Sequence, residues 1–172
     1  MIGIINASPL IYLSKIGLIG LLPQLFDEIW TSIEVKKEVL KFKSSPEVPI
    51  LEEAFTSWLK IHPIDDNRFL SKLLEMQIHR GEATIIAIAR ELKIIRKGPI
   101  AIIDDITARE IARTFDIPVI GTVGILLRAV KKALLSPDQF KNKIRMLVEE
   151  TEFGMSVKLY SALLEKLKEL IP

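Results

Sequence analysis

Two adjacent aspartates, Asp104 and Asp105, stand where an apolar run ends and an amphipathic segment begins. Residues 99–103 have the composition of a buried strand, and 106–113 have the spacing of a helix. Carboxylates at such a junction suit a metal-dependent α/β enzyme, because ligands bind beyond the carboxyl ends of parallel strands. They also repel each other unless water, a cation or a helix N-terminus neutralises them. The pair therefore predicts a metal site, or else Asp105 as a helix N-cap with Asp104 as a solvated loop residue.

Other polar residues could converge on this pair. Glu82 opens a predicted helix, where the positive helix end favours a carboxylate, and Glu38 lies among lysines in another predicted helix. Each has a simpler interpretation, Glu82 as an ordinary first-turn glutamate and Glu38 as part of a solvated helix face. Asn6 follows the first predicted strand and offers either a turn or a neutral carbonyl ligand. Ser8 is expected to cap the next helix, and its hydroxyl could face the same site.

Other reaction classes have less support in the sequence. The chain has no cysteine, which excludes a thiol nucleophile and a cysteine zinc site. His62 and His79 do not form a Ser-His-Asp pattern. The segment Gly-Thr-Val-Gly at 121–124 lacks the ending of a phosphate loop, so we interpret it as a strand-to-helix turn capped by Thr122. A net charge of +2, from 24 basic and 22 acidic residues, neither demands nor excludes a nucleic-acid partner.

The elements that would position these residues alternate between strands and helices. Strands are expected at 2–6, 28–31, 59–64, 100–103 and 117–120. Helices are expected at 10–16, 18–26, 33–42, 50–58, 67–78, 82–92, 106–115, 121–133, 137–150 and 157–170, with a loop at 43–49. Gly81 is expected to end the helix before Glu82, and Ile33, Val35 and Val39 to face the core. The alternation predicts an α/β fold with a central parallel sheet and helices on both faces.

The chain of 172 residues is expected to form one domain, 1–172, with 136–172 as a C-terminal helical extension. Residues 1–5 lack the basic start of a signal peptide, and no apolar stretch is long enough to span a bilayer. We therefore expect a cytoplasmic protein without membrane contact. The apolar helices at 10–26 and 157–170 carry more aliphatic surface than a monomer readily exposes, which predicts a homodimer.

Five short stretches together indicate a family. They are Ile-Ile-Asn-Ala-Ser-Pro-Leu-Ile (4–11), Val-Lys-Lys-Glu-Val (35–39), Gly-Glu-Ala (81–83), Ile-Asp-Asp-Ile-Thr-Ala-Arg (103–109) and Val-Ile-Gly-Thr-Val-Gly (119–124). In order and spacing they resemble the PIN-domain family, in the VapC-like branch near the ribonucleases of bacterial and archaeal toxin–antitoxin pairs. The resemblance implies a Rossmann-like, three-layer α/β/α sandwich whose clustered acids bind Mg²⁺ or Mn²⁺ and cleave RNA.

The resemblance puts Glu38, Glu82 and Asp105 at acidic positions, with Asp104 adjacent; which aspartate is the main ligand stays open. The chain departs from the family at Asn6, because the family's first strand normally ends in an aspartate. An asparagine keeps one oxygen for a cation but lacks the charge, so affinity for a hard divalent ion should fall.

The function implied is that of a metal-dependent endoribonuclease, the toxin of a pair with an antitoxin protein, in which a metal-activated water attacks the phosphodiester. The expected substrate-binding residues are Ser8, Arg80, Arg109 and Thr122. One alternative is a catalytically weakened or inactive PIN-like module that only binds RNA or a protein. Another is an α/β phosphotransfer enzyme with Asp104 as nucleophile, which has less support because such enzymes place the nucleophile after the first strand.

Overall fold

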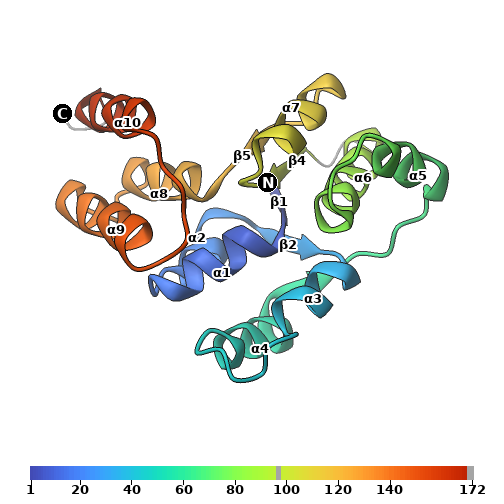
Figure 1. Cartoon of the computed structure of the whole chain (residues 1–172), viewed down its shortest axis with the longest axis horizontal. Helices are drawn as coiled ribbons and strands as arrows, with labels where there is room; N and C mark the ends of the chain where they lie inside the picture. Colours follow the sequence, from blue (N-terminus) through green and yellow to red (C-terminus); the bar gives the residue numbers. More distant parts are fainter. Residues whose placement is uncertain (96–97, 170–172) are drawn as a thin grey trace.

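A computed structural model describes residues 1–95 and 98–169 and contains a central, fully parallel sheet (Figure 1). Its strands are β1 (Ile2–Ile5), β2 (Glu28–Thr31), β3 (Leu59–Ile61), β4 (Pro99–Ile102) and β5 (Val119–Ile120). Their order in the sheet is β3-β2-β1-β4-β5, so β1 is the central strand. Every residue of β1 and β4 is buried, as expected for parallel strands covered on both faces.

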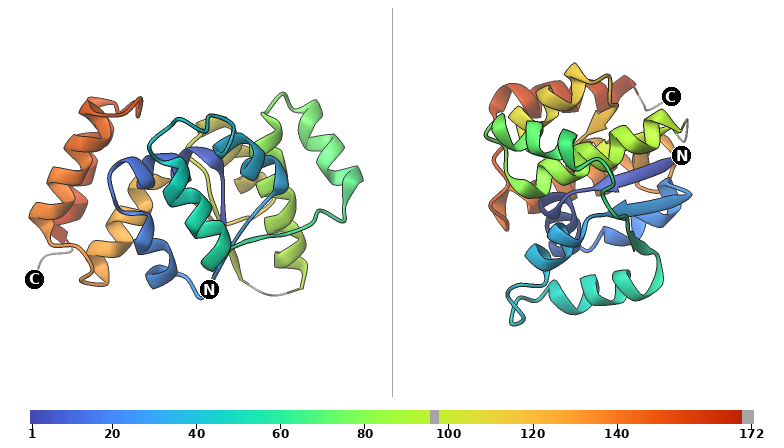
Figure 2. Two further views of the ribbon diagram at one scale, coloured as in Figure 1. Left: turned by 90° about the horizontal axis from the view of Figure 1, so that it is seen from below. Right: turned by 90° about the vertical axis from the view of Figure 1, so that its right-hand side faces the viewer.

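Helices cover both faces of the sheet (Figure 2). They are α1 (Ala7–Lys15), η1 (Ile19–Leu21), α2 (Leu22–Leu25), α3 (Ile33–Val39), α4 (Val48–Ser57), α5 (Asn67–Glu75), α6 (Arg80–Ile94), α7 (Ile106–Thr114), α8 (Thr122–Lys131), α9 (Pro137–Glu149) and α10 (Val157–Glu169). On one face α1 and α2 contact α8, and on the other α6 packs on β1 and β4, with α5 and α7 against it. Outside α8 lie α9 and α10, at the end of the molecule opposite α5 (Figures 1 and 2). The predicted three-layer α/β/α sandwich with extra C-terminal helices is confirmed.

The strand register brings the carboxyl ends of β1, β4 and β5 to one edge of the sheet. Ile5 of β1 lies beside Ile102 of β4, and the backbone N–H of the next residue, Asn6, donates to the Ile102 carbonyl at 3.0 Å. Ile103 N donates to the Ile120 carbonyl at 2.9 Å. The polar residues that follow β1, β4 and β5 therefore start from the same edge.

Three of the helices that carry predicted site residues begin differently from the prediction, and α4 also begins earlier than predicted, at Val48. Because α1 already begins at Ala7, Ser8 lies in its first turn instead of capping it. Gly81 does not end a helix, since α6 begins at Arg80 and Gly81 lies in its first turn. Thr122 is the first residue of α8 and not its cap. Thus α1 and α6 begin earlier than predicted, and in α8 the cap position belongs to Gly121.

Other differences concern element length. The predicted helix 33–42 ends at Val39, and Ile33 is exposed, because it lies about 200° around the helix from the buried Val35. The predicted helix 18–26 is divided into η1 and α2. The predicted strands 59–64 and 117–120 are shorter, and β3 lies at a sheet edge, where Pro63 follows it. The predicted end of the last helix, at Leu170, lies outside the described residues.

The segment 10–26 does not supply the exposed surface expected for a dimer. Its large aliphatic side chains are mostly buried in the core: Leu10, Leu13, Ile16, Leu21, Leu22 and Leu25. No single described helix is long and apolar enough to cross a membrane. Taken together, α1 and residues 19–25 have the required length and composition, but the two segments are bent by 114° relative to each other. By contrast, α10 leaves Val157, Leu159 and Tyr160 exposed, the first of them by 83%.

Candidate functional site

Asn6 occupies the carboxyl end of the central strand and is only 2% exposed. Its Nδ2 donates a hydrogen bond to Glu82 Oε1 at 3.1 Å. The reverse amide orientation would set two acceptors against each other, so Oδ1 points away from Glu82. Within the described part of the chain this oxygen has no hydrogen-bond partner. A buried acceptor without a donor costs about 1–3 kcal/mol, which makes Oδ1 a position where a cation or a water would be stabilising.

Glu38 of α3 reaches the same place from a different element. A Cβ added to Gly81 would lie 3.1 Å from Asn6 Oδ1 and 3.2 Å from Glu38 Oε2. The missing side chain of Gly81 thus leaves room for both oxygens at the first turn of α6. Burial raises the pKa of Glu38, the charge of Glu82 raises it further, and His79 opposes the shift. Two carboxylates and one amide oxygen therefore gather at this end of the sheet.

A pair of buried hydroxyls fixes α3 against α6. Ser32 caps α3, because its Oγ accepts a hydrogen bond from Val35 N at 3.1 Å. Thr84 Oγ1 lies 2.8 Å from Ser32 Oγ and 2.6 Å from the Gly81 carbonyl oxygen. Since α3 carries Glu38 and α6 carries Glu82, this contact sets the two glutamates relative to each other. Nothing in the sequence pattern had suggested a role for Thr84.

Asp104 is held by the start of α8 and is not a solvated loop residue. Its Oδ1 accepts from Thr122 N at 2.7 Å, and its Oδ2 accepts from Thr122 Oγ1 at 2.6 Å. A Cβ on Gly121 would lie only 2.6 Å from Oδ1, so this close approach requires glycine. Burial raises the pKa of Asp104, and the bonds from Thr122 and the charge of Arg109 partly offset that shift. Both oxygens are engaged, which argues against Asp104 as a nucleophile.

Asp105 has a different environment from its neighbour. It is exposed, and its Oδ1 accepts from Ala108 N at 2.7 Å. The predicted N-cap of α7 is therefore confirmed. Of the two adjacent aspartates, Asp104 is the one whose carboxylate is held inside the fold.

An open cleft of about 910 Å³ lies along this edge of the sheet. The predicted site residues that line it are Ser8, Glu82, Asp104, Asp105 and Arg109. Thr122 stands behind Asp104, to which it is hydrogen-bonded. Arg80 points elsewhere: it pairs with Glu34 at 3.6 Å and borders a separate hollow beside β3.

A family model described as a PIN domain matches residues 2–169. The chain belongs to the PIN-domain family. The match includes α9 and α10, beyond the motifs that end near residue 124. A comparison with curated proteins finds no significant match. Membership gives this chain a nuclease-like fold of a kind that typically binds divalent metals.

The acidic end of this PIN domain holds fewer close carboxylates than a preformed metal cluster requires. In residues 1–95 and 98–169, no three acidic or histidine side chains are grouped closely enough to hold a metal ion. Asn6 contributes no charge, and Asp104 is bonded to Thr122. The oxygens of Asn6, Glu38 and Glu82 still suit a hard cation that keeps several waters, as Mg²⁺ does. The orphaned Asn6 Oδ1 is the atom such an ion would satisfy.

Sequence reasoning did not find the outer wall of the cleft in this PIN domain. That wall comes from α1, α10 and the segment before α10, and includes Tyr12, Phe153, Leu159, Leu163 and Lys166. Tyr12 lies one helical turn after Ser8, so helix periodicity could have placed it there. The other four depend on how α9 and α10 return along α8, for which the sequence offers no local signal.

Proposed function

We propose that this PIN domain is a metal-dependent endoribonuclease that uses Mg²⁺ or Mn²⁺. The single observation that carries the proposal is Asn6 Oδ1, a buried acceptor without a donor in the described residues, beside the Glu38 carboxylate. Together with Glu82 it forms the set of oxygens that would hold the ion. When bound, the ion lowers the pKa of a water ligand and neutralises the scissile phosphate.

The chain's own residues divide the remaining tasks. Glu38 would hold the ion as a carboxylate, and because burial raises its pKa, a proton competes with the ion for this group. Arg109 lies on the cleft wall near Asp104 and can pair with a phosphate oxygen. Asp104 acts as a positioning residue, because it fixes the first turn of α8 through Thr122. Ser8 lines the cleft two residues after Asn6, and we assign its hydroxyl to substrate binding.

The decisive experiment compares two glutamine variants of the whole chain on a mixed RNA pool, with a chelator control. Glu82→Gln keeps an oxygen for the Asn6 amide but removes the charge, so cleavage should be lost. Glu75→Gln removes an exposed charge at the end of α5, outside the cleft, and should leave cleavage unchanged. Equal rates for both variants would reject the assignment of the site. Cleavage that persists in the chelator would reject metal dependence.

The runner-up function is a PIN-like module that binds RNA or a protein without cutting. It is favoured by the neutral Asn6 and by the bonds from Thr122 to Asp104, both of which reduce the charge offered to an ion. Binding of RNA without cleavage in either Mg²⁺ or Mn²⁺ would favour this function over the nuclease.

The biological setting we propose is that of a VapC-like toxin controlled by an antitoxin protein and acting in the cytoplasm. Support comes from the motif resemblance and from Ile106, which is 71% exposed at the cleft and could be covered by a partner. We also propose a homodimer, now through the start of α10, where Val157 is exposed outside the cleft lining, and not through 10–26. A monodisperse monomer in light scattering at high concentration would reject the dimer.

A further inference from the structure

The cleft extends from the acidic end of the sheet into a trough between α8 and α10. Val123 and Leu127 of α8 and Leu159 and Leu163 of α10 give it apolar sides. Phe153 lies in the segment between α9 and α10 and borders the same trough. The space is thus continuous from the carboxylates to an apolar and aromatic wall.

An aromatic pair stands at this wall. The Tyr12 and Phe153 rings are 5.3 Å apart between centroids and meet edge to face at 86°. Both side chains are half-buried and both border the cleft, so part of each ring is available to a ligand. Tyr12 and Phe153 line the same cleft as Asp104 and Glu82. Burial raises the pKa of Tyr12, and the charges of Asp104 and Glu152 raise it further. The pair therefore lies beside the site and not on a remote surface.

Phe153 is positioned by a turn at the end of α9. Its backbone N–H donates to Thr151 Oγ1 at 3.1 Å, and the Thr151 hydroxyl in turn donates to the Leu147 carbonyl. This fixed backbone holds the ring against Tyr12 before any ligand arrives. A preformed aromatic surface loses little conformational entropy on binding.

Cations complete the trough. Lys166 is exposed on α10 and borders it, and Arg109 borders it from α7. An aromatic face combined with basic side chains along a groove is the arrangement that binds single-stranded nucleic acid. The bases of a duplex are stacked on each other and cannot reach such a ring.

We propose that Tyr12 and Phe153 form a stacking platform for one unpaired base of RNA, and that Lys166 binds a backbone phosphate beside it. The choice of RNA rests on the proposed function. The strand then lies with its backbone along the trough and its scissile phosphate toward Glu82. Stacking is tolerant of sequence, so the platform selects strandedness more than base identity.

Binding in a chelator separates this inference from catalysis. We would measure the affinity of the whole chain for a short, fluorescently labelled single-stranded RNA by anisotropy. Phe153→Leu keeps an apolar side chain but removes the ring, and should weaken binding about ten- to a hundredfold. Phe153→Tyr keeps the ring and should retain affinity. Thermal melts of both variants check that the turn at Thr151 remains folded.

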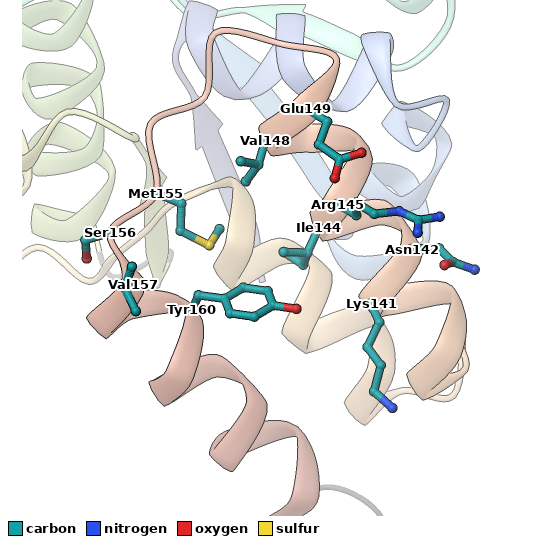
Figure 3. A pocket seen from close by; sticks show the side chains of 10 residues that line it. All are labelled: Lys141, Asn142, Ile144, Arg145, Val148, Glu149, Met155, Ser156, Val157 and Tyr160. Carbon is teal, nitrogen blue, oxygen red and sulfur yellow. The ribbon is translucent and has the colours of Figure 1, made fainter.

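The matched control is an aromatic residue on the other side of α10. Tyr160 extends from α10 toward Ile144 of α9, in a groove that adjoins the cleft at Ser156 (Figure 3). Tyr160 itself does not line the cleft. Tyr160→Leu should leave RNA affinity unchanged. Lys166→Gln should reduce the slope of log K against log salt by about 0.7, the value for one phosphate contact on a single strand. Lys168→Gln, an exposed lysine of α10 outside the cleft lining, should not change the slope.

Each result bears on one proposal separately. If RNA binds and Phe153→Leu behaves like Tyr160→Leu, the platform is wrong even where the chain cleaves RNA. Binding that depends on Phe153 but never leads to cleavage supports the platform and rejects the nuclease. Equal affinity for duplex RNA, or no RNA binding at all, overturns the platform.

Discussion

Replacing Asn6 by aspartate tests the centre of the proposed site. The amide now donates to Glu82 Oε1 at 3.1 Å, while its own oxygen is buried without a partner. Asn6→Asp has nearly the same shape, but it exchanges the donor for a negative charge that faces another carboxylate. Without metal the variant should be less stable than the parent, and with metal it should bind the ion more tightly.

The size of the destabilisation follows from this distance. Two unit charges 3.1 Å apart repel by about 5 kcal/mol at an effective dielectric constant of 20. The destabilisation is limited to about 4 kcal/mol, because that is the free energy needed at pH 7 to protonate a carboxyl whose ordinary pKa is near 4. One protonated carboxyl removes the repulsion between the two groups. For a chain of this length each kcal/mol lowers Tm by roughly 2–4 °C, so we expect a fall of about 10 °C. The loss should shrink at acidic pH, where the shared proton is bound more readily.

Metal binding should reverse this loss. An ion that binds only the folded state stabilises it by RT ln(1 + [L]/Kd), about 2.7 kcal/mol at one hundred times Kd. The added carboxylate lowers Kd, so the Mg²⁺-dependent rise in Tm should be larger in Asn6→Asp than in the parent. Cleavage of RNA should increase in the same order.

The assay is a series of thermal melts across Mg²⁺ concentrations at fixed ionic strength. Asn142→Asp adds the same charge to an exposed position on α9 and should show neither effect. Combining Asn6→Asp with Glu82→Gln again sets an amide against a carboxylate, and should restore metal-free stability. A parent and an Asn6→Asp variant with equal Mg²⁺ responses would show that Asn6 does not border a metal site. The binding-module function would then be preferred.

Further predictions concern the two aspartates and their supports. Gly121→Ala should lower the free energy of unfolding, measured by chemical denaturation, by about 1–3 kcal/mol, because its Cβ would lie 2.6 Å from Asp104 Oδ1. Gly154→Ala is the control, since the space around Gly154 is open and its free energy of unfolding should change little. Asp105→Ala should cost about 1 kcal/mol by the same measurement through loss of the helix cap, and Asp105→Asn should not. Burial raises the pKa of Asp104 and of Glu38 above their ordinary values of 3.8 and 4.5. Protonation of either carboxyl therefore stabilises the folded state, and this stabilisation should be lost as the pH rises through the raised pKa values. The rise in Tm that Mg²⁺ produces should instead become smaller as the pH falls through the raised pKa of Glu38. Thermal melts at a series of pH values, with and without Mg²⁺, would measure both pH dependences.

The fold was predictable because its signals are local. Continuous apolar runs gave the central strands, and β2 matches its prediction from Glu28 to Thr31. Helix ends were less predictable near the site. A serine followed by proline favours a helix start at Ser8, yet α1 begins at Ala7, because the strand before it ends at Ile5 and the chain turns at once. There the packing of strand and helix overrides the capping preference.

The site was predictable only in part, for the same physical reason. Residues that end strands share an edge in any parallel sheet, so the meeting of Asn6 with the residues after β4 follows from topology. The orientation of each side chain does not. Asp104 and Asp105 are equivalent in the sequence, and they differ because Thr122 binds one carboxylate while the Ala108 amide binds the other. Such partners lie on elements whose approach the sequence pattern does not determine.

The hydrogen bond from Asn6 to Glu82 lowers the charge repulsion at the acidic edge of the sheet. An aspartate at this position would face Glu82 with like charge, and the folded state would then depend on a bound cation or a proton. The amide supplies a donor instead, so the bonded carboxylate is satisfied while the amide oxygen remains directed at the Glu38 side. Under the proposed function, asparagine at this position therefore lowers the affinity for metal and raises the stability of the metal-free protein. If the chain is the metal-dependent nuclease we propose, it should remain folded when metal is scarce and cleave RNA only where the ion is abundant.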